Sequence, residues 1–201
     1  KFLYDHGMVD INEKDEITIE TLSGIKKLKA YTSGGKVNRL RVDMGKAILE
    51  PKEIPVLLDG DKVVDRPVEI AGKNYNITCV SMGNPHCVVF MDDIDNLDIE
   101  TVGPEFENDK LFPERVNTEF VTVLDDHTIK MRVWERGSGE TWACGTGACA
   151  VAVAACENGF CKKGEDIKIK LKGGDLIINY TDETVYMTGN AEKVFEGEVE
   201  V

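Results

Sequence analysis

The chain has 201 residues, with 24 Lys and Arg against 37 Asp and Glu, so its formal net charge is −13. This acidic balance argues against general binding to nucleic acid or to an anionic membrane, because both need a basic protein surface. Six cysteines at irregular spacing, with no Cys-x-x-Cys pair, exclude a disulfide scaffold. No apolar run is long enough to span a bilayer. We therefore expect reduced thiols in a cytoplasmic protein.

The first part of the chain is predicted to form short antiparallel strands. Residues 1–7 are typical of the last turn of an amphipathic helix that Gly7 closes. Alternating apolar positions predict strands over 17–22, 25–31, 37–44, 63–70 and 75–81. Gly-rich or Asn-containing turns separate these strands at 23–24, 33–36 and 71–74. Residues 45–55, which hold two prolines, are expected to be irregular.

The second part combines further strands with two helices. Strands are predicted over 87–91, 116–123, 128–135, 167–171, 176–180, 185–189 and 193–201. A weak helix is expected over 99–108. The pattern of strands, one central apolar helix and more strands indicates an α+β fold with an antiparallel or mixed sheet around a helix, rather than βαβ winding.

The central helix follows Cys144, in the apolar run that continues to Ala155. Thr146 is the expected N-cap, and Asn158 with Gly159 supplies the stop. A thiol just before the first turn lies at free N–H groups and at the positive end of the helix dipole, which lower a thiol pKa and attract an anion. The simpler interpretation is a small buried hydrophobic residue.

Other cysteines and polar residues have ordinary interpretations when each is taken alone. Cys149 and Cys156 are expected in the helix core, and Cys87 in the core of a strand. The cysteine spacing from 144 to 161 matches no common metal-ligand pattern. The Asn84–His86 segment is either a simple turn or part of a site. The pair Glu135 and Arg136 is either an exposed ion pair or a partly buried one that holds an ammonium and a carboxylate.

Taken together, four motifs and a later segment have the order and spacing of one enzyme family. The motifs are Gly83-Asn84-Pro85-His86-Cys87-Val88, Glu114-Arg115-Val116-Asn117, Glu135-Arg136-Gly137-Ser138-Gly139-Glu140-Thr141 and Ala143-Cys144-Gly145-Thr146-Gly147-Ala148. The later segment is Tyr186-Met187-Thr188-Gly189. Over essentially its whole length the chain resembles diaminopimelate epimerase. The resemblance implies a cofactor-independent isomerase that interconverts LL- and meso-2,6-diaminopimelate for lysine and peptidoglycan synthesis, with one cysteine on each face of the α-carbon.

The resemblance also implies a domain plan and a site. The plan has two similar α+β domains, the first incomplete, over 1–78 and 79–189, with a final strand at 190–201 that returns to the first domain. The protein is expected to be a cytoplasmic homodimer that binds a small molecule, without nucleic acid, membrane or metal. By motif position Cys144 is one base, and the backbone N–H groups of Gly145 and Thr146 hold the α-carboxylate. The remaining substrate contacts are assigned to Asn84, His86, Asn117, Glu135 and Arg136.

One departure from the family pattern is that the 201 residues hold no Cys-Gly-Asn-Gly motif, which carries the family's first catalytic cysteine. We expect the chain to start just after that motif and to be inactive alone, unless Cys79 or Cys87 replaces the missing base. Three alternatives stay open at this point. A proline racemase-like isomerase shares the fold, a phenazine-type isomerase lacks the equivalent of Cys144, and a non-catalytic binding module needs no second base.

Overall fold

A computed structural model describes residues 1–21 and 24–199 of the chain. The chain divides into two compact units, Lys1–Asp43 with Thr188–Val201, and Met44–Met187. Residues 44–78 therefore belong with the second unit, whereas the sequence interpretation put them in a first domain over 1–78. The predicted turn at 23–24 falls partly outside the described residues. Among the described residues, no helix is both long and apolar enough to cross a membrane.

The first unit begins with the expected end of a helix. Helix α1 (Phe2–Asp5) closes at Gly7, whose φ is +68°, and the N–H groups of Gly7 and Met8 donate to the carbonyls of Tyr4 and Leu3 at 2.9 and 2.8 Å. This pair of bonds is a Schellman motif, which needs the left-handed conformation that glycine adopts readily.

Three antiparallel strands follow in this unit: β1 (Glu16–Thr21), β2 (Gly24–Ser33) and β3 (Lys36–Gly45). Residues 191–199 form neither helix nor strand, so the final strand predicted near 193–201 is absent from this range. Its apolar side chains Val194, Phe195 and Val199 are each more than 80% exposed, so they give a strand no buried face.

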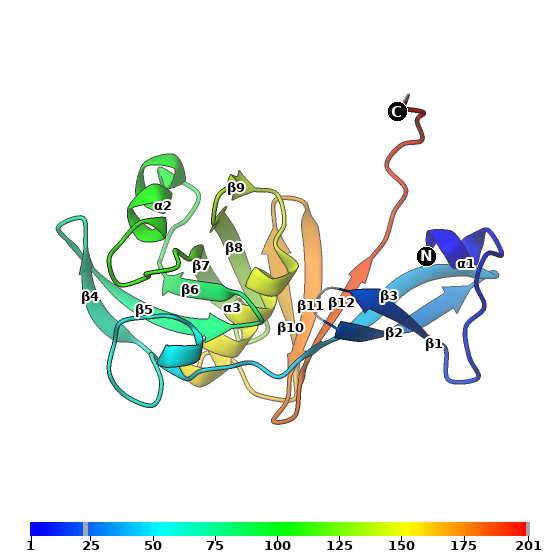
Figure 1. Cartoon of the computed structure of the whole chain (residues 1–201), viewed down its shortest axis with the longest axis horizontal. Coiled ribbons are helices and arrows are strands. Elements are labelled where there is room, and N and C mark those ends of the chain that lie inside the picture. Colours follow the sequence, from blue (N-terminus) through cyan, green and yellow to red (C-terminus); the bar gives the residue numbers. More distant parts are fainter. Residues whose placement is uncertain (22–23, 200–201) are drawn as a thin grey trace. The chain divides into compact units, whose positions relative to one another are not determined.

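The second unit is built on a mixed sheet (Figure 1). Its strands run in the order β12-β11-β10-β8-β7-β6-β5-β4, with β9 beside β8. Their bounds are β4 Arg66–Ile70, β5 Lys73–Ser81, β6 Pro85–Phe90, β7 Asn117–Asp125, β8 Thr128–Glu135, β9 Gly139–Thr141, β10 Asp166–Leu171, β11 Gly174–Tyr180 and β12 Val185–Asn190. The pairs β6/β7 and β8/β10 are parallel, and the other pairs described in this unit are antiparallel. The α+β expectation is confirmed, although the short β9 was not predicted.

Two helices cover opposite faces of this sheet, and a 3-10 turn (Pro51–Glu53) lies in the irregular segment. Helix α3 (Gly145–Glu157) is buried from Gly147 to Ala155, as its uniform Ala and Val content predicts, and packs with Val88, Val121 and Val133. Helix α2 (Ile99–Glu107) packs in a second core with alternate residues of the same strands, such as Val89 and Phe120. Because side chains alternate between the two faces of a strand, His86, Asn117, Glu119 and Glu135 all lie on the α3 face.

Candidate active site

Cys144 is itself the N-cap of α3. Its backbone is extended, with φ −134° and ψ 108°, and its Sγ accepts a hydrogen bond from the N–H of Gly147 at 3.3 Å. Thr146, the N-cap expected from the sequence, lies inside the first turn with its Oγ1 at 3.6 Å from the same sulfur. The thiol takes the acceptor role that a Ser or Asp oxygen has at an ordinary cap. The thiol is therefore held at the start of the helix by this cap.

The first turn of α3 also presents backbone donors beside this thiol. The N–H of Gly147 is used by Cys144 Sγ, and that of Ala148 donates to the Cys144 carbonyl at 2.9 Å. Within the described part of the chain, no residue accepts from the N–H groups of Gly145 and Thr146, which belong to the orphan donors of a helix N-terminus. Two neighbouring N–H groups at a helix start form a geometry that suits a carboxylate.

The pKa of the Cys144 thiol is raised to about 12, first by burial and second by the negative charge of Glu119. The hydrogen bonds from Thr146 and Gly147 act in the opposite direction but are outweighed. The lowered thiol pKa expected from the helix dipole is therefore wrong for the structure as it stands. Cys144 is only 6% exposed, and desolvation of a thiolate costs more than one helix N-terminus returns. The resting group is a thiol.

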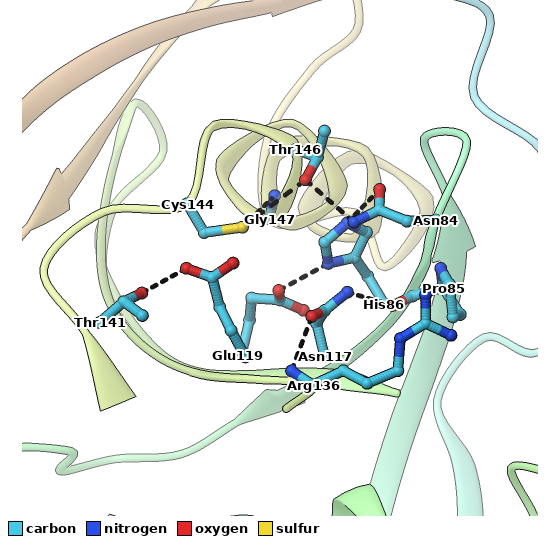
Figure 2. A network of polar contacts seen from close by, with 11 residues as sticks. Asn84, Pro85, His86, Asn117, Glu119, Arg136, Thr141, Cys144, Thr146 and Gly147 are labelled. Atoms are coloured by element: carbon cyan, nitrogen blue, oxygen red, sulfur yellow. Dashed lines mark hydrogen bonds and ion pairs between the residues drawn. The ribbon is translucent and has the colours of Figure 1, made fainter. Parts of the chain in front are cut away.

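A chain of polar contacts links this thiol to the sheet (Figure 2). His86 Nδ1 lies 2.7 Å from Glu119 Oε1, and His86 Nε2 lies 3.1 Å from Asn84 Oδ1. Asn84 Nδ2 in turn donates to Thr146 Oγ1 at 3.3 Å. His86 and Glu119 are fully buried. The structure thus brings Asn84, His86 and Thr146 together with Cys144, and both ring nitrogens of His86 are already engaged.

Asn117 joins the turn after β8 to the start of β6. Its Nδ2 donates to the carbonyl of Pro85 at 2.8 Å, and its Oδ1 accepts from the N–H of Arg136 at 2.9 Å. The Arg136 guanidinium donates to the carbonyl of Glu114 at 2.8 Å, while Glu135 accepts from the hydroxyl of Thr141. These contacts connect segments from three of the predicted motifs.

Sequence reasoning missed two buried carboxylates that support this arrangement. Glu119 lies in a fully buried part of β7, and a lone charged residue within such an apolar strand was a signal that could have revealed it. Glu107, the last residue of α2, accepts from the N–H of Gly137 at 2.9 Å, from Trp134 Nε1 at 2.7 Å and from Arg115 at 2.9 Å. No sequence pattern distinguishes Glu107 from an ordinary helical glutamate.

Cys79 and Cys87 lie away from this site. They face each other across β5 and β6, are fully buried, and belong to the core on the α2 face. Burial, followed by the contact with Cys79, raises the pKa of Cys87 well above its usual value. Cys87 is a core residue as predicted, and the sheet separates both thiols from Cys144.

The fold of this chain occurs in solved racemases and epimerases. A probable proline racemase from Agrobacterium radiobacter K84 superimposes with a TM-score of 0.70 at 16% identity, covering 94% of this chain and 61% of its own. A hydroxyproline epimerase from Agrobacterium vitis gives 0.68 at 14% identity, covering 94% and 60%. This chain thus spans about 60% of the length of these two structures and shares their fold.

Closer relatives identify the family. The diaminopimelate epimerase family model matches residues 78–194. Proteins named diaminopimelate epimerase from Agathobacter rectalis and Acetivibrio thermocellus are 49% and 51% identical, each over 100% of this chain and 72% and 71% of their own length. One from Desulfovibrio desulfuricans is 52% identical over 98% of this chain and 70% of its own. The chain belongs to the diaminopimelate epimerase family of isomerases, which confirms the resemblance in its motifs.

Proposed function

We propose that this chain supplies one side of the active site of an enzyme that interconverts LL- and meso-2,6-diaminopimelate without a cofactor, on the route to lysine and peptidoglycan. The observation that carries the proposal is the Cys144 thiol at the N-terminus of α3, beside the N–H groups of Gly145 and Thr146. Membership of the family supports the substrate and the type of reaction.

The substrate α-carboxylate binds the N–H groups of Gly145 and Thr146. When the α-proton leaves, negative charge spreads onto this carboxylate, so fixed donors stabilise the transition state more than the ground state. Glu135 and Arg136 then hold the substrate's ammonium and carboxylate groups. Asn84 and Asn117 contact its distal end, and His86 orients the polar groups near the thiol.

Inversion requires two proton-transfer groups on opposite faces of the α-carbon. An amino-acid α-proton is very weakly acidic, so an acid and a base must act with well-placed electrostatic stabilisation. Cys144 serves one face. As a thiol it donates a proton directly, and it acts as a base once the substrate's ammonium offsets the nearby negative charge of Glu119 and Glu135. A second thiol serves the other face, and neither Cys79 nor Cys87 lies on the Cys144 side of the sheet.

We therefore propose that the 201 residues alone do not invert the α-carbon of the substrate. The test incubates this chain and its Cys144→Ala variant with LL-diaminopimelate in deuterated water, and measures α-deuterium and the meso isomer. We expect no meso isomer, and any α-proton exchange should disappear in the variant. Formation of meso isomer at the rates of full-length family enzymes would contradict the two-thiol division.

A covalent probe separates this proposal from a non-catalytic binding module. An aziridine analogue of diaminopimelate places an electrophile at the reacting carbon, so it should alkylate Cys144. Absence of an adduct under saturating probe would favour simple binding. We further propose a cytoplasmic homodimer, as the resemblance implies, and light scattering of the purified protein tests the assembly.

A further inference from the structure

Glu119 is a buried carboxylate to which none of the family motifs quoted above gives a role. The residue is fully buried in β7. Its Oε1 contacts His86, whereas its Oε2 is buried without a hydrogen-bond partner in the described part of the chain. A carboxylate buried without compensating partners destabilises the folded state. A site that keeps this charge with one oxygen unpaired suggests a function for the charge.

Glu119 is near Cys144 along two routes. The first route runs from Glu119 through His86 and Asn84 to Thr146, whose hydroxyl lies 3.6 Å from Cys144 Sγ.

The second route passes through the space beside the Cα atom of Gly147. A Cβ added to Gly147 would lie 2.6 Å from Glu119 Oε1 and 3.1 Å from Cys144 Sγ. The carboxylate and the thiol therefore both border the space that a side chain at Gly147 would fill.

We propose that Glu119 is a positioning residue of the proton-transfer site: its carboxylate accepts the Nδ1 proton of His86, holds that ring with Nε2 beside Asn84, and places a negative charge near the Cys144 thiol until a cationic substrate offsets it. Glu135 from β8 also raises the pKa of Cys144, and Cys144 in turn raises the pKa of Cys149 within α3. Glu119 comes before Glu135 among the charges that raise the pKa of Cys144.

This inference rests on the proposed role of Cys144, but its test uses neither substrate nor turnover, so it can fail while the proposed function stands. The rate of Cys144 alkylation by iodoacetamide is measured by peptide mass spectrometry at about pH 8, in the wild type, Glu119→Gln and Glu69→Gln. The first variant keeps an oxygen that accepts from His86 and removes the charge. The second removes an exposed carboxylate on β4.

We expect Glu119→Gln to raise the Cys144 rate at least about threefold. A fall of one pKa unit gives tenfold more thiolate, and the lower basicity of the thiolate costs about threefold in nucleophilicity. Glu69→Gln should leave the rate unchanged. Cys149, fully buried in the same helix, reports local opening and should stay unlabelled. An unchanged or lower Cys144 rate, or equal labelling of Cys149, overturns the proposal.

A spectroscopic measurement on the wild type tests the part of the proposal that concerns His86. Nitrogen-15 NMR of the imidazole rings should show a slowly exchanging proton on Nδ1 of His86, while His6 and His127, both exposed, exchange fast. The Nδ1 proton should persist in Glu119→Gln, because the amide oxygen still accepts it. A wild-type His86 without a proton on Nδ1 overturns the positioning role.

Discussion

Glu107 accepts a hydrogen bond at 2.9 Å from the backbone N–H of Gly137, in the turn directly after the candidate residues Glu135 and Arg136. The same carboxylate accepts from Trp134 Nε1 at 2.7 Å. One buried side chain of α2 therefore fixes both the end of β8 and the turn that follows it. The position of Arg136, next to this turn, therefore depends on α2, which packs on the face of the sheet opposite to Cys144.

Glu107→Ala should lower the free energy of unfolding by about 2 kcal/mol or more, because it leaves the Gly137 N–H and the Trp134 indole without their acceptor. Urea denaturation measures the loss. Glu100→Ala, at an exposed position of the same helix, is the matched control and should change little. Equal losses in the two variants would mean that the carboxylate of Glu107 has no special structural role.

The N-cap role of Cys144 predicts different effects for two small substitutions. Cys144→Ser keeps a side-chain acceptor for the N–H of Gly147 and should retain stability at neutral pH. Cys144→Ala removes the acceptor and should cost about 1 kcal/mol. Both variants should lose the proposed proton transfer. Denaturation curves compare the two, and a serine variant less stable than the alanine variant would exclude the cap.

The raised pKa of Cys144 makes stability fall at alkaline pH. Burial holds the folded-state pKa at about 12 against a usual value of 9.0, so the unfolded chain loses its thiol proton first. The stability that the folded protein gains from its protonated Cys144 thiol is fully present below about pH 9. It is lost as the pH rises toward 12, by up to about 1.4 kcal/mol per pH unit.

Cys144→Ser should therefore lose less stability than the wild type between about pH 8 and pH 10.5, by up to about 2 kcal/mol. Cys156, whose pKa burial also raises to about 12, contributes equally in both proteins. Urea titrations at the two pH values measure the difference. Parallel losses would show that the Cys144 thiol titrates as it does in the unfolded chain.

Two glycines of the first turn of α3 should tolerate alanine differently. A Cβ at Gly147 would lie 2.6 Å from a buried oxygen of Glu119, whereas a Cβ at Gly145 would meet the flexible end of Met187 at 3.1 Å. Gly147→Ala should cost about 1–3 kcal/mol, as overpacking usually does, and Gly145→Ala clearly less. Thermal unfolding ranks the two variants, and the reverse order would contradict the placement of Glu119 beside α3.

Local patterns predicted most of the second unit. Strand β8 was predicted with its observed bounds, because Ile129, Met131 and Val133 alternate into one core. Helix α3 was recognisable from its uniform small apolar residues. The predicted strand over 193–201 shows the limit of this signal, since alternation without a partner strand does not bury side chains in 191–199.

The sequence indicated residues of the candidate site, but it did not indicate the pKa of the thiol or the buried contacts around it. Motif order predicted a set of site residues, and the structure brings Asn84, His86 and Thr146 together with Cys144. The direction of the Cys144 pKa shift was wrong because the sequence does not reveal how completely the thiol is buried. The contact between the buried carboxylate of Glu119 and His86 requires strand register as well, since the pairing of β6 with β7 brings the two together. The substrate contacts and domain limits stay predictions.

The parallel register of β6 and β7 determines which sequence changes the site can tolerate. His86 pairs with Asn117, and the α2 crossover separates these two positions in the chain. Extra residues in the loops of that crossover leave the pairing intact. One residue inserted between Asn117 and Glu119 would place these two side chains on opposite faces of the sheet, so that only one of them could face α3. Homologous chains should therefore differ in length between β6 and β7 but not within β7. A chimera of two such chains should have its junction in the crossover.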